Sequence, residues 1–131
     1  MSYLLDTVIC IALLKGKDEE LIAKIRSREP SDFRLSSVVR GELLFGARNS
    51  QHVDRNLSLL NRFFSQFDSL AFDDRAADFY GLIRASLESA GTPIGANDLL
   101  LASIAEARDL TLITRNRSEF ARVPGLRWES W

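Results

Sequence analysis

Carboxylate and amide side chains occur where the expected helices and strands of this chain begin or end. Asp6 directly follows the apolar stretch YLL, and Asp98 opens an apolar helix. Glu42 lies within the first two turns of another expected helix, Asn116 follows the stretch LTLIT, and Glu119 comes one helical turn later. Carboxylates that converge in one cleft raise one another's pKa values unless a cation neutralises them. An all-oxygen donor set suits Mg²⁺ or Mn²⁺ rather than zinc, and such an ion activates water for hydrolysis.

The same residues also have an ordinary structural interpretation. The chain has 18 acidic residues, so some fall near strand ends by chance. Asp98 would also be favourable simply as a negative charge near a helix N-terminus. On the pattern alone, the metal-site and helix-capping interpretations both remain open.

The alternation of apolar patterns predicts the elements that must position these side chains. Strands are expected at 3–5, 33–39, 69–72, 110–114 and 126–130, and helices at 7–14, 18–29, 38–48, 53–67 and 73–89, then from 98 and at 117–120. Such alternation favours an α/β fold with a parallel sheet of about five short strands and helices on both faces. Functional residues then gather at the carboxyl ends of the strands. Because no repeat or linker is present, we expect one domain over residues 1–131.

Composition indicates a soluble, cytoplasmic protein with no membrane span. Apolar residues make up 46% and charged residues 27% of the chain. The single cysteine, Cys10, lies between isoleucines and is expected in the core, and His52, the only histidine, has no partner for a metal or catalytic site. The net charge is −1, so any RNA-binding face must be local. Arginines supply 14 of the 17 cations, a bias that genomic base composition would also explain. Arg40, Arg48 and Arg115 are candidate phosphate contacts, because the arginine side chain suits phosphate.

Four longer motifs resemble one enzyme family nearly end to end. They are LLDT at the start, GELLFGA around Glu42, YGLIRASLESAGTPIGANDLLLAS around Asp98, and LTLITRNRSEFARVPGL near the end. In this order and spacing the chain resembles PIN-domain ribonucleases, specifically the VapC-type toxins of VapBC toxin–antitoxin pairs. The resemblance places Asp6, Glu42 and Asp98 at the family's metal-binding acids.

Two positions depart from the family pattern. Val8 stands where the family usually has asparagine, and Asn116 stands where many PIN domains have a fourth acid. Asparagine is common at the position of Asn116 among the VapC-type members. Glu119 is then the nearest acid that could replace the missing fourth carboxylate. These departures bear on the number of bound metal ions and on the level of activity.

The resemblance implies a Mg²⁺-dependent endoribonuclease toxin that cuts structured RNA such as tRNA. It also implies a homodimer and a VapB-type antitoxin that docks over the active-site groove. We expect that groove on the helices at 18–28 and 38–48, which carry the apolar residues Leu21, Ile22, Ile25, Leu43, Leu44 and Phe45. Thr7 and Thr114 flank site positions, where they either hydrogen-bond a metal ligand or water or cap a strand end.

Two alternatives belong to other functional classes. A phosphoacceptor receiver domain shares the doubly wound topology and the acidic Mg²⁺ site, but it needs a lysine after its last strand. This chain has no lysine beyond Lys24, which argues against a receiver. A PIN-fold binding or regulatory module that has lost catalysis through Val8 and Asn116 stays open.

Overall fold

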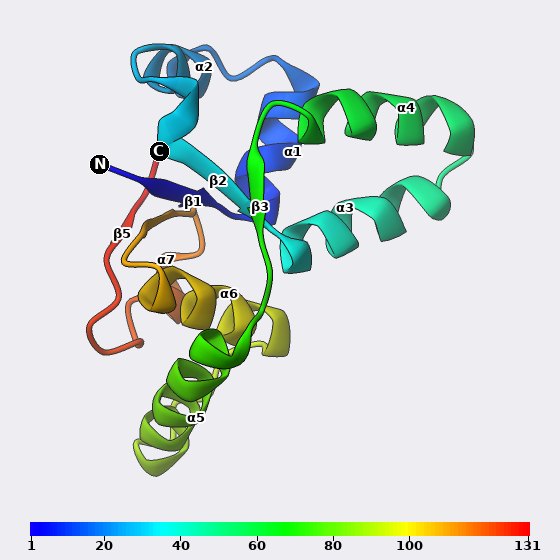
Figure 1. Cartoon of the computed structure of the whole chain (residues 1–131). Coiled ribbons are helices and arrows are strands. Elements are labelled where there is room, and N and C mark those ends of the chain that lie inside the picture. The colour runs from blue at the N-terminus through cyan, green and yellow to red at the C-terminus, as the bar shows by residue number, and fades with distance from the viewer.

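Five short parallel strands form the centre of the computed structural model, which describes residues 1–131 (Figure 1). The strands are β1 (Tyr3–Leu5), β2 (Phe33–Ser36), β3 (Asp68–Leu70), β4 (Thr111–Ile113) and β5 (Trp128–Glu129). Their order in the sheet is β3-β2-β1-β4-β5, and every neighbouring pair is parallel. This confirms the expected α/β fold with a parallel sheet of about five strands.

Seven α-helices connect the strands. They are α1 (Thr7–Lys15), α2 (Glu19–Arg26), α3 (Ser37–Arg48), α4 (Val53–Phe64), α5 (Asp74–Ser89), α6 (Ala96–Ala107) and α7 (Arg117–Phe120). Four of them begin at a side chain that accepts a hydrogen bond from the backbone N–H three residues later, which satisfies an otherwise unpaired donor. These caps are Asp6, Asp18, Ser36 and Asp73.

Several elements are shorter than their apolar patterns predict. The strand expected to reach residue 39 ends at Ser36, because the Ser36 hydroxyl accepts from the Val39 N–H and starts α3. The helix expected to reach residue 67 ends at Phe64, and the chain makes a turn before β3. Apolar side chains continue to pack beyond an element's last backbone hydrogen bond, so the pattern overestimates its length.

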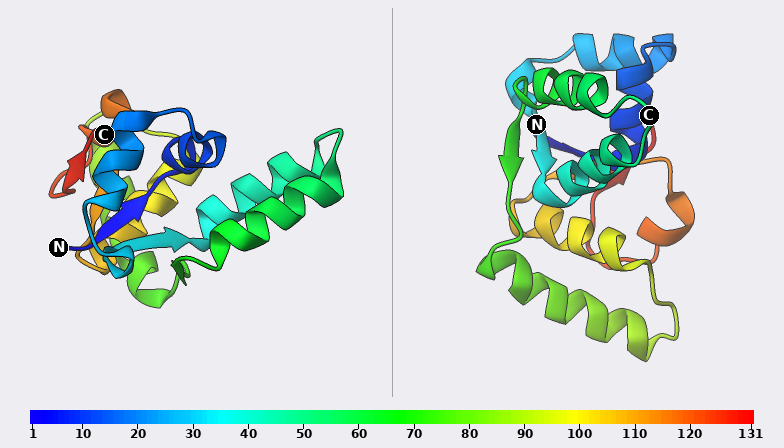
Figure 2. Two further views of the ribbon diagram at one scale, coloured as in Figure 1. Left: turned by 90° about the horizontal axis from the view of Figure 1, so that it is seen from above. Right: turned by 90° about the vertical axis from the view of Figure 1, so that its right-hand side faces the viewer.

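The sheet is wound in two directions from β1. The chain moves from β1 to β2 and β3 on one side, then crosses to β4 and β5 on the other. Right-handed crossovers therefore place α1 and α2 on one face and α5 and α6 on the opposite face (Figures 1 and 2). Figure 2 shows α3 and α4 as a helical pair that projects beyond the carboxyl end of β2. The carboxyl ends of β1, β2 and β4 thus face a region bordered by this pair and by α6.

One hydrophobic core of 28 buried residues spans both faces of the sheet. Cys10 is fully buried within it, as expected for a packing residue. His52 is exposed at the start of α4, apart from the carboxylates. None of the helices is both long enough and apolar enough to span a bilayer.

Candidate active site

Asp6 occupies the junction between β1 and α1. Its Oδ1 atom accepts a hydrogen bond of 2.9 Å from the Ile9 N–H, so the helix start fixes the direction of the carboxylate. Only 6% of the residue is exposed, and burial raises its pKa above the ordinary value. The Thr114 hydroxyl and the Ile9 N–H hydrogen-bond the carboxylate and oppose this shift. Asp6 is therefore both the α1 cap and a rigid acidic group at the carboxyl edge of the sheet.

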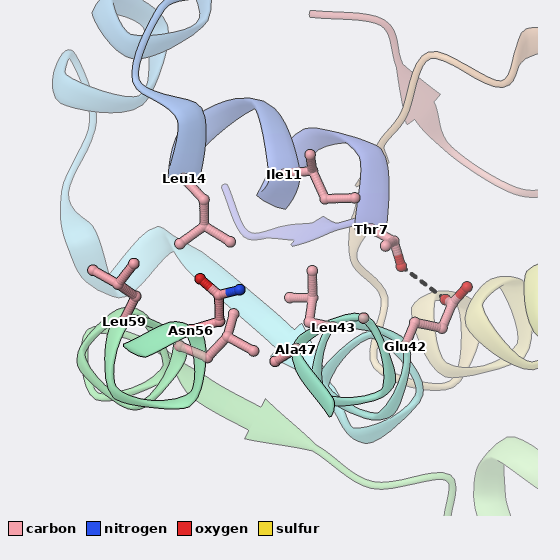
Figure 3. Close-up of a pocket in the computed structure, with 10 residues that line it drawn as sticks. Thr7, Ile11, Leu14, Glu42, Leu43, Ala47, Asn56 and Leu59 are labelled. Atoms are coloured by element: carbon pink, nitrogen blue, oxygen red, sulfur yellow. Dashed lines mark hydrogen bonds between the residues drawn. The ribbon is translucent and has the colours of Figure 1, made fainter. Parts of the chain in front are cut away.

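Glu42 projects from α3 toward the first turn of α1. The Thr7 hydroxyl donates a hydrogen bond of 2.7 Å to Glu42 Oε1, which joins residues 35 positions apart (Figure 3). Since Thr7 directly follows Asp6, this bond brings the Glu42 carboxylate to the end of β1. Of the two roles expected for Thr7, hydrogen-bonding an acidic residue of the site is the one that its contact supports.

Asp98, Asn116 and Glu119 form a second hydrogen-bonded group across the same edge. The Asn116 Nδ2 atom lies 3.2 Å from Asp98 Oδ2 and 3.1 Å from Glu119 Oε2, so one amide donates to both carboxylates. Glu119 Oε1 also accepts from the Gly95 N–H at 3.2 Å. Asp98 itself makes no capping bond in α6, whose N-cap is Gly95. Asp98 lies in the first turn of α6, where its negative charge is favourable as the alternative interpretation expects, but its side chain does not cap the helix.

The acids in this region act on one another through their charges. The pKa of Asp98 is raised to about 7, first by burial, then by its hydrogen bond with Glu119 and by the negative charges of Glu119, Glu42 and Asp6. The pKa of Glu119 is lowered, chiefly by the hydrogen bond with Asp98. The Asp98–Glu119 pair thus shares one proton near neutral pH. The clustered negative charge raises the pKa of Asp98 rather than that of Glu119.

The donor chemistry of this edge fits a hard divalent cation. All the available ligands are oxygen atoms, and no arginine forms an ion pair with Asp6, Glu42 or Asp98. No three Asp, Glu, His or Cys side chains are grouped closely enough to enclose a metal ion by themselves. Mg²⁺ usually keeps several waters and takes only one or two protein carboxylates, so the open arrangement suits it.

The arginines proposed as phosphate contacts are only partly free. Arg115 pairs with Asp18 at 2.5 Å and donates from Nε to the Trp131 carbonyl oxygen at 2.8 Å. The Arg40 guanidinium lies over the Phe64 ring, 4.5 Å from its centroid. Arg48 is exposed in the last turn of α3. Arg115 therefore ties the β4–α7 junction to Asp18 and Trp131, while its positive charge also lowers the pKa of Asp6, and its role as a phosphate contact stays a prediction.

Thr114 is buried at the end of β4 and makes two contacts at this edge. Besides its bond to Asp6, its hydroxyl accepts from the Asn116 N–H at 3.0 Å. It thus combines the two roles expected of it, because it hydrogen-bonds an acidic site residue and also stabilises the turn after the strand. The Gly95 contact with Glu119 was not anticipated from the sequence, which holds no local signal for it.

An apolar groove of about 290 Å³ runs between α1 and the α3–α4 pair and ends at Thr7 and Glu42 (Figure 3). Ile11, Leu14 and Leu59 line it and are 38%, 39% and 40% exposed. An antitoxin groove was expected on the helices at 18–28 and 38–48, and this hollow is lined from α3 as expected but takes its other walls from α1 and α4. No residue of α2 lines it, because α2 buries Leu21 in the core and α1 lies opposite α3 instead.

The family follows from comparison with known proteins. The PIN domain model matches residues 3–126. The chain is similar to "tRNA(fMet)-specific endonuclease VapC" of Shigella flexneri, with 40% identity over 100% of this chain and 98% of that protein. It is also similar to "Ribonuclease VapC2" of Rickettsia felis, with 39% identity and the same two coverages.

A solved structure gives the same result. The chain superposes on a chain of the DNA-bound VapBC crystal structure from Salmonella typhimurium with a TM-score of 0.91 and 37% identity, covering 100% of this chain and 98% of that one. The chain therefore belongs to the PIN domain family, in the branch of the VapC ribonucleases.

Proposed function

We propose that this chain is a Mg²⁺-dependent endoribonuclease that acts as the toxin of a toxin–antitoxin pair. Its relatives are named as ribonucleases, and the Shigella flexneri relative is named for tRNA(fMet), which supports structured RNA such as tRNA as the substrate. The observation that carries the proposal is the convergence of Asp6, Glu42, Asp98 and Glu119 at one edge of the sheet, each held there by hydrogen bonds. Burial and the negative charges of the other three carboxylates raise the pKa of Asp98, and a bound cation would relieve that repulsion.

Asp6, Asp98 and Glu42 would hold the Mg²⁺ or Mn²⁺ ion. When bound there, the ion lowers the pKa of the attacking water and balances the negative charge that develops on the phosphodiester. The protein supplies the orientation. The Ile9 N–H fixes Asp6, the Thr7 hydroxyl fixes one oxygen of Glu42, and Asn116 fixes Asp98 against Glu119.

The direct test is RNA cleavage by the purified chain. We expect total tRNA to be cut in the presence of Mg²⁺, cutting to stop with EDTA and to return with excess Mg²⁺, and mapping of the new 5′ ends to give a restricted set of positions. Asp78→Asn should cut as wild type does, because Asp78 is an exposed acid on α5 outside this edge. Binding of an antitoxin without cleavage under any of these conditions would instead support the regulatory module.

Removing the Thr7 hydroxyl should lower activity without unfolding the protein. Thr7→Val keeps the side-chain shape and loses the donor to Glu42, so we expect cleavage to fall by about 10-fold or more, as for other groups that orient metal ligands. Thr7→Ser keeps the hydroxyl and should retain most of the activity. Initial cleavage rates at several Mg²⁺ concentrations measure the effect. Equal rates for Thr7→Val and Thr7→Ser would contradict it.

Restoring the family's asparagine at position 8 should strengthen the site. Val8 is 53% exposed in the first turn of α1, so a polar side chain fits there without loss of core packing. We expect Val8→Asn to raise the cleavage rate, or to lower the Mg²⁺ concentration required for it, by about 10-fold. A Mg²⁺ titration of both proteins measures this. Val8→Thr, which has the valine shape and a shorter polar reach, is the control.

The partners in this proposal are a VapB-type antitoxin and a second copy of the chain. The apolar groove that ends at Glu42 would accept an amphipathic helix of the antitoxin, and a charged side chain from that helix would then reach the acids. Co-expression with the neighbouring gene and light scattering of the purified protein test the two associations separately. A non-toxic monomer in both conditions would contradict this part of the proposal.

A further inference from the structure

A second hollow lies beside Glu42 and differs in character from the apolar groove. This cleft, of about 560 Å³, lies between α3 and the start of α6 and shares Thr7 and Glu42 with the groove. Phe45, Asn97 and Ser37 also line it. The Thr7–Glu42 hydrogen bond therefore lies between an apolar hollow and a mixed polar and aromatic one.

Phe45 is the most exposed aromatic side chain next to the acidic edge. It is 69% exposed, although it is large and apolar. It follows Glu42 by three residues on α3, and residues three apart lie on the same face of a helix. A single exposed apolar residue is ordinary on a surface. An exposed aromatic ring that lines the same cleft as a site carboxylate is a more specific arrangement.

The other residues of the cleft give it room and polar edges. Gly41 lies one turn before Phe45, and a Cβ atom added there would meet nothing within 4 Å, so the space beside the ring is open. Asn97 offers both an amide donor and a carbonyl acceptor, and Ser37 offers a hydroxyl. Both are exposed on the cleft wall.

We propose that this cleft binds a nucleobase next to the scissile phosphate of the RNA. The base stacks on Phe45, and its polar edge meets the Asn97 amide while the phosphate lies at Glu42 and its neighbouring acids. Aromatic stacking with polar contacts at the base edge is the usual way in which proteins hold unstacked RNA bases. The inference rests on the proposed function, since it names how the RNA substrate is held.

The cleft suits a base better than it suits a partner helix. A docking helix buries a continuous apolar stripe, and the groove lined by Ile11, Leu14 and Leu59 offers such a surface on the other side of Glu42. The cleft is lined by the polar side chains of Ser37, Asn97 and Glu42 together with the apolar Phe45, Val38 and Leu100. An apolar helix would leave the Ser37 hydroxyl and the Asn97 amide unpaired, whereas the polar edge of a base would pair with them.

Phe45→Ala tests the stacking contact. We expect KM for RNA to rise about 10-fold with little change in kcat, because stacking holds the bound substrate without entering the reaction. Phe45→Trp should restore the wild-type KM. Leu82→Ala is the matched control, since Leu82 on α5 is 68% exposed and lies outside the cleft. A changed oligomeric state of Phe45→Ala with an unchanged KM would overturn the proposal in favour of a protein interface.

Gly41→Leu tests the same cleft by filling it. Leucine favours helix more than glycine does, and the new side chain meets no protein atoms near its Cβ, so the fold should be kept. We expect a rise in KM similar to that of Phe45→Ala. Gly81→Leu on α5, another exposed helical glycine with open space, is the control and should have no effect. Equal KM values for Gly41→Leu and Gly81→Leu would overturn the proposal.

RNA with an abasic sugar beside the mapped cut identifies the contact directly. Wild type should lose about 10-fold in kcat/KM on this RNA, and Phe45→Ala should lose nothing further. Additive losses would overturn the proposal. Binding of the same RNAs, measured by fluorescence anisotropy, separates the hypothesis of a nuclease from the hypothesis of a base-binding site. Weaker binding by Phe45→Ala without any cleavage by wild type would refute the nuclease function alone, whereas cleavage by wild type with no effect of Phe45→Ala or Gly41→Leu would refute the base site alone.

Discussion

Asp98→Asn is expected to abolish RNA cleavage and, in the metal-free protein, to raise the free energy of unfolding above pH 7. Cleavage should fall by more than about 100-fold, because Asp98 is proposed to bind the metal ion directly and losing a direct ligand costs more than losing a group that orients one. The fold should survive. An asparagine at position 98 can still accept from the Asn116 amide and can donate to Glu119, so both hydrogen bonds of this side chain keep a partner.

The gain in stability follows from the direction of the pKa shift. Folding raises the pKa of Asp98 from 3.8 to about 7, so the folded state favours the protonated carboxyl. Its stabilising contribution is complete below about pH 4 and is lost as the pH rises through about 7. The neutral amide of the variant carries no such penalty. After allowance for solvent screening, we expect the variant to gain about 1–2 kcal/mol over wild type at pH 8 and nothing at pH 4.

Urea denaturation in EDTA at pH 4, 6 and 8 measures this difference. Asp78→Asn, on the exposed face of α5, is the control and should track wild type at every pH. Added Mg²⁺ should stabilise wild type and not Asp98→Asn, since only the former would retain the cation. Unchanged cleavage by Asp98→Asn would remove Asp98 from the site. A pH-independent difference from wild type would show that the acids do not repel one another as described.

Leu59→Glu is expected to release the protein from its antitoxin while leaving RNA cleavage intact. Leu59 is 40% exposed on α4, at the opposite end of the apolar groove from Glu42 (Figure 3). A glutamate there would be desolvated by any apolar helix lying in the groove. We expect affinity for the antitoxin to fall by more than about 30-fold, which corresponds to a loss of about 2 kcal/mol. Glutamate is also a good helix former, so α4 should be kept.

The measurement compares inhibition of cleavage by increasing antitoxin. Leu82→Glu is the matched control, because Leu82 is also an exposed helical leucine but lies on α5 outside the groove. Full cleavage by free Leu59→Glu shows that the variant is folded. If the antitoxin inhibits Leu59→Glu and Leu82→Glu at the same concentrations, the groove is not where it docks.

Local sequence determined the identity of most elements and the edge on which the acids lie. Asp6 comes after a buried apolar triplet and Asp98 within the first turn of α6, so alternating strands and helices bring both toward one edge of a parallel sheet. Caps such as Asp18 and Asp73 were also predictable, because they bond to backbone atoms three residues away. Element ends were less accurate, since apolar patterns extend past the last backbone hydrogen bond.

Only the tertiary structure decided which side chains meet. Thr7 pairs with Glu42 across 35 residues, which places the Thr7 hydroxyl at the site. Arg115 pairs with Asp18 across 97 residues while its charge also acts on Asp6. The groove likewise lies beside α1 rather than α2, whose apolar face is turned into the core around Leu21. The spacing of apolar residues in the sequence predicts that a helix has an apolar face. Which neighbour covers that face depends on the packing of several helices at once, and no local pattern encodes that packing.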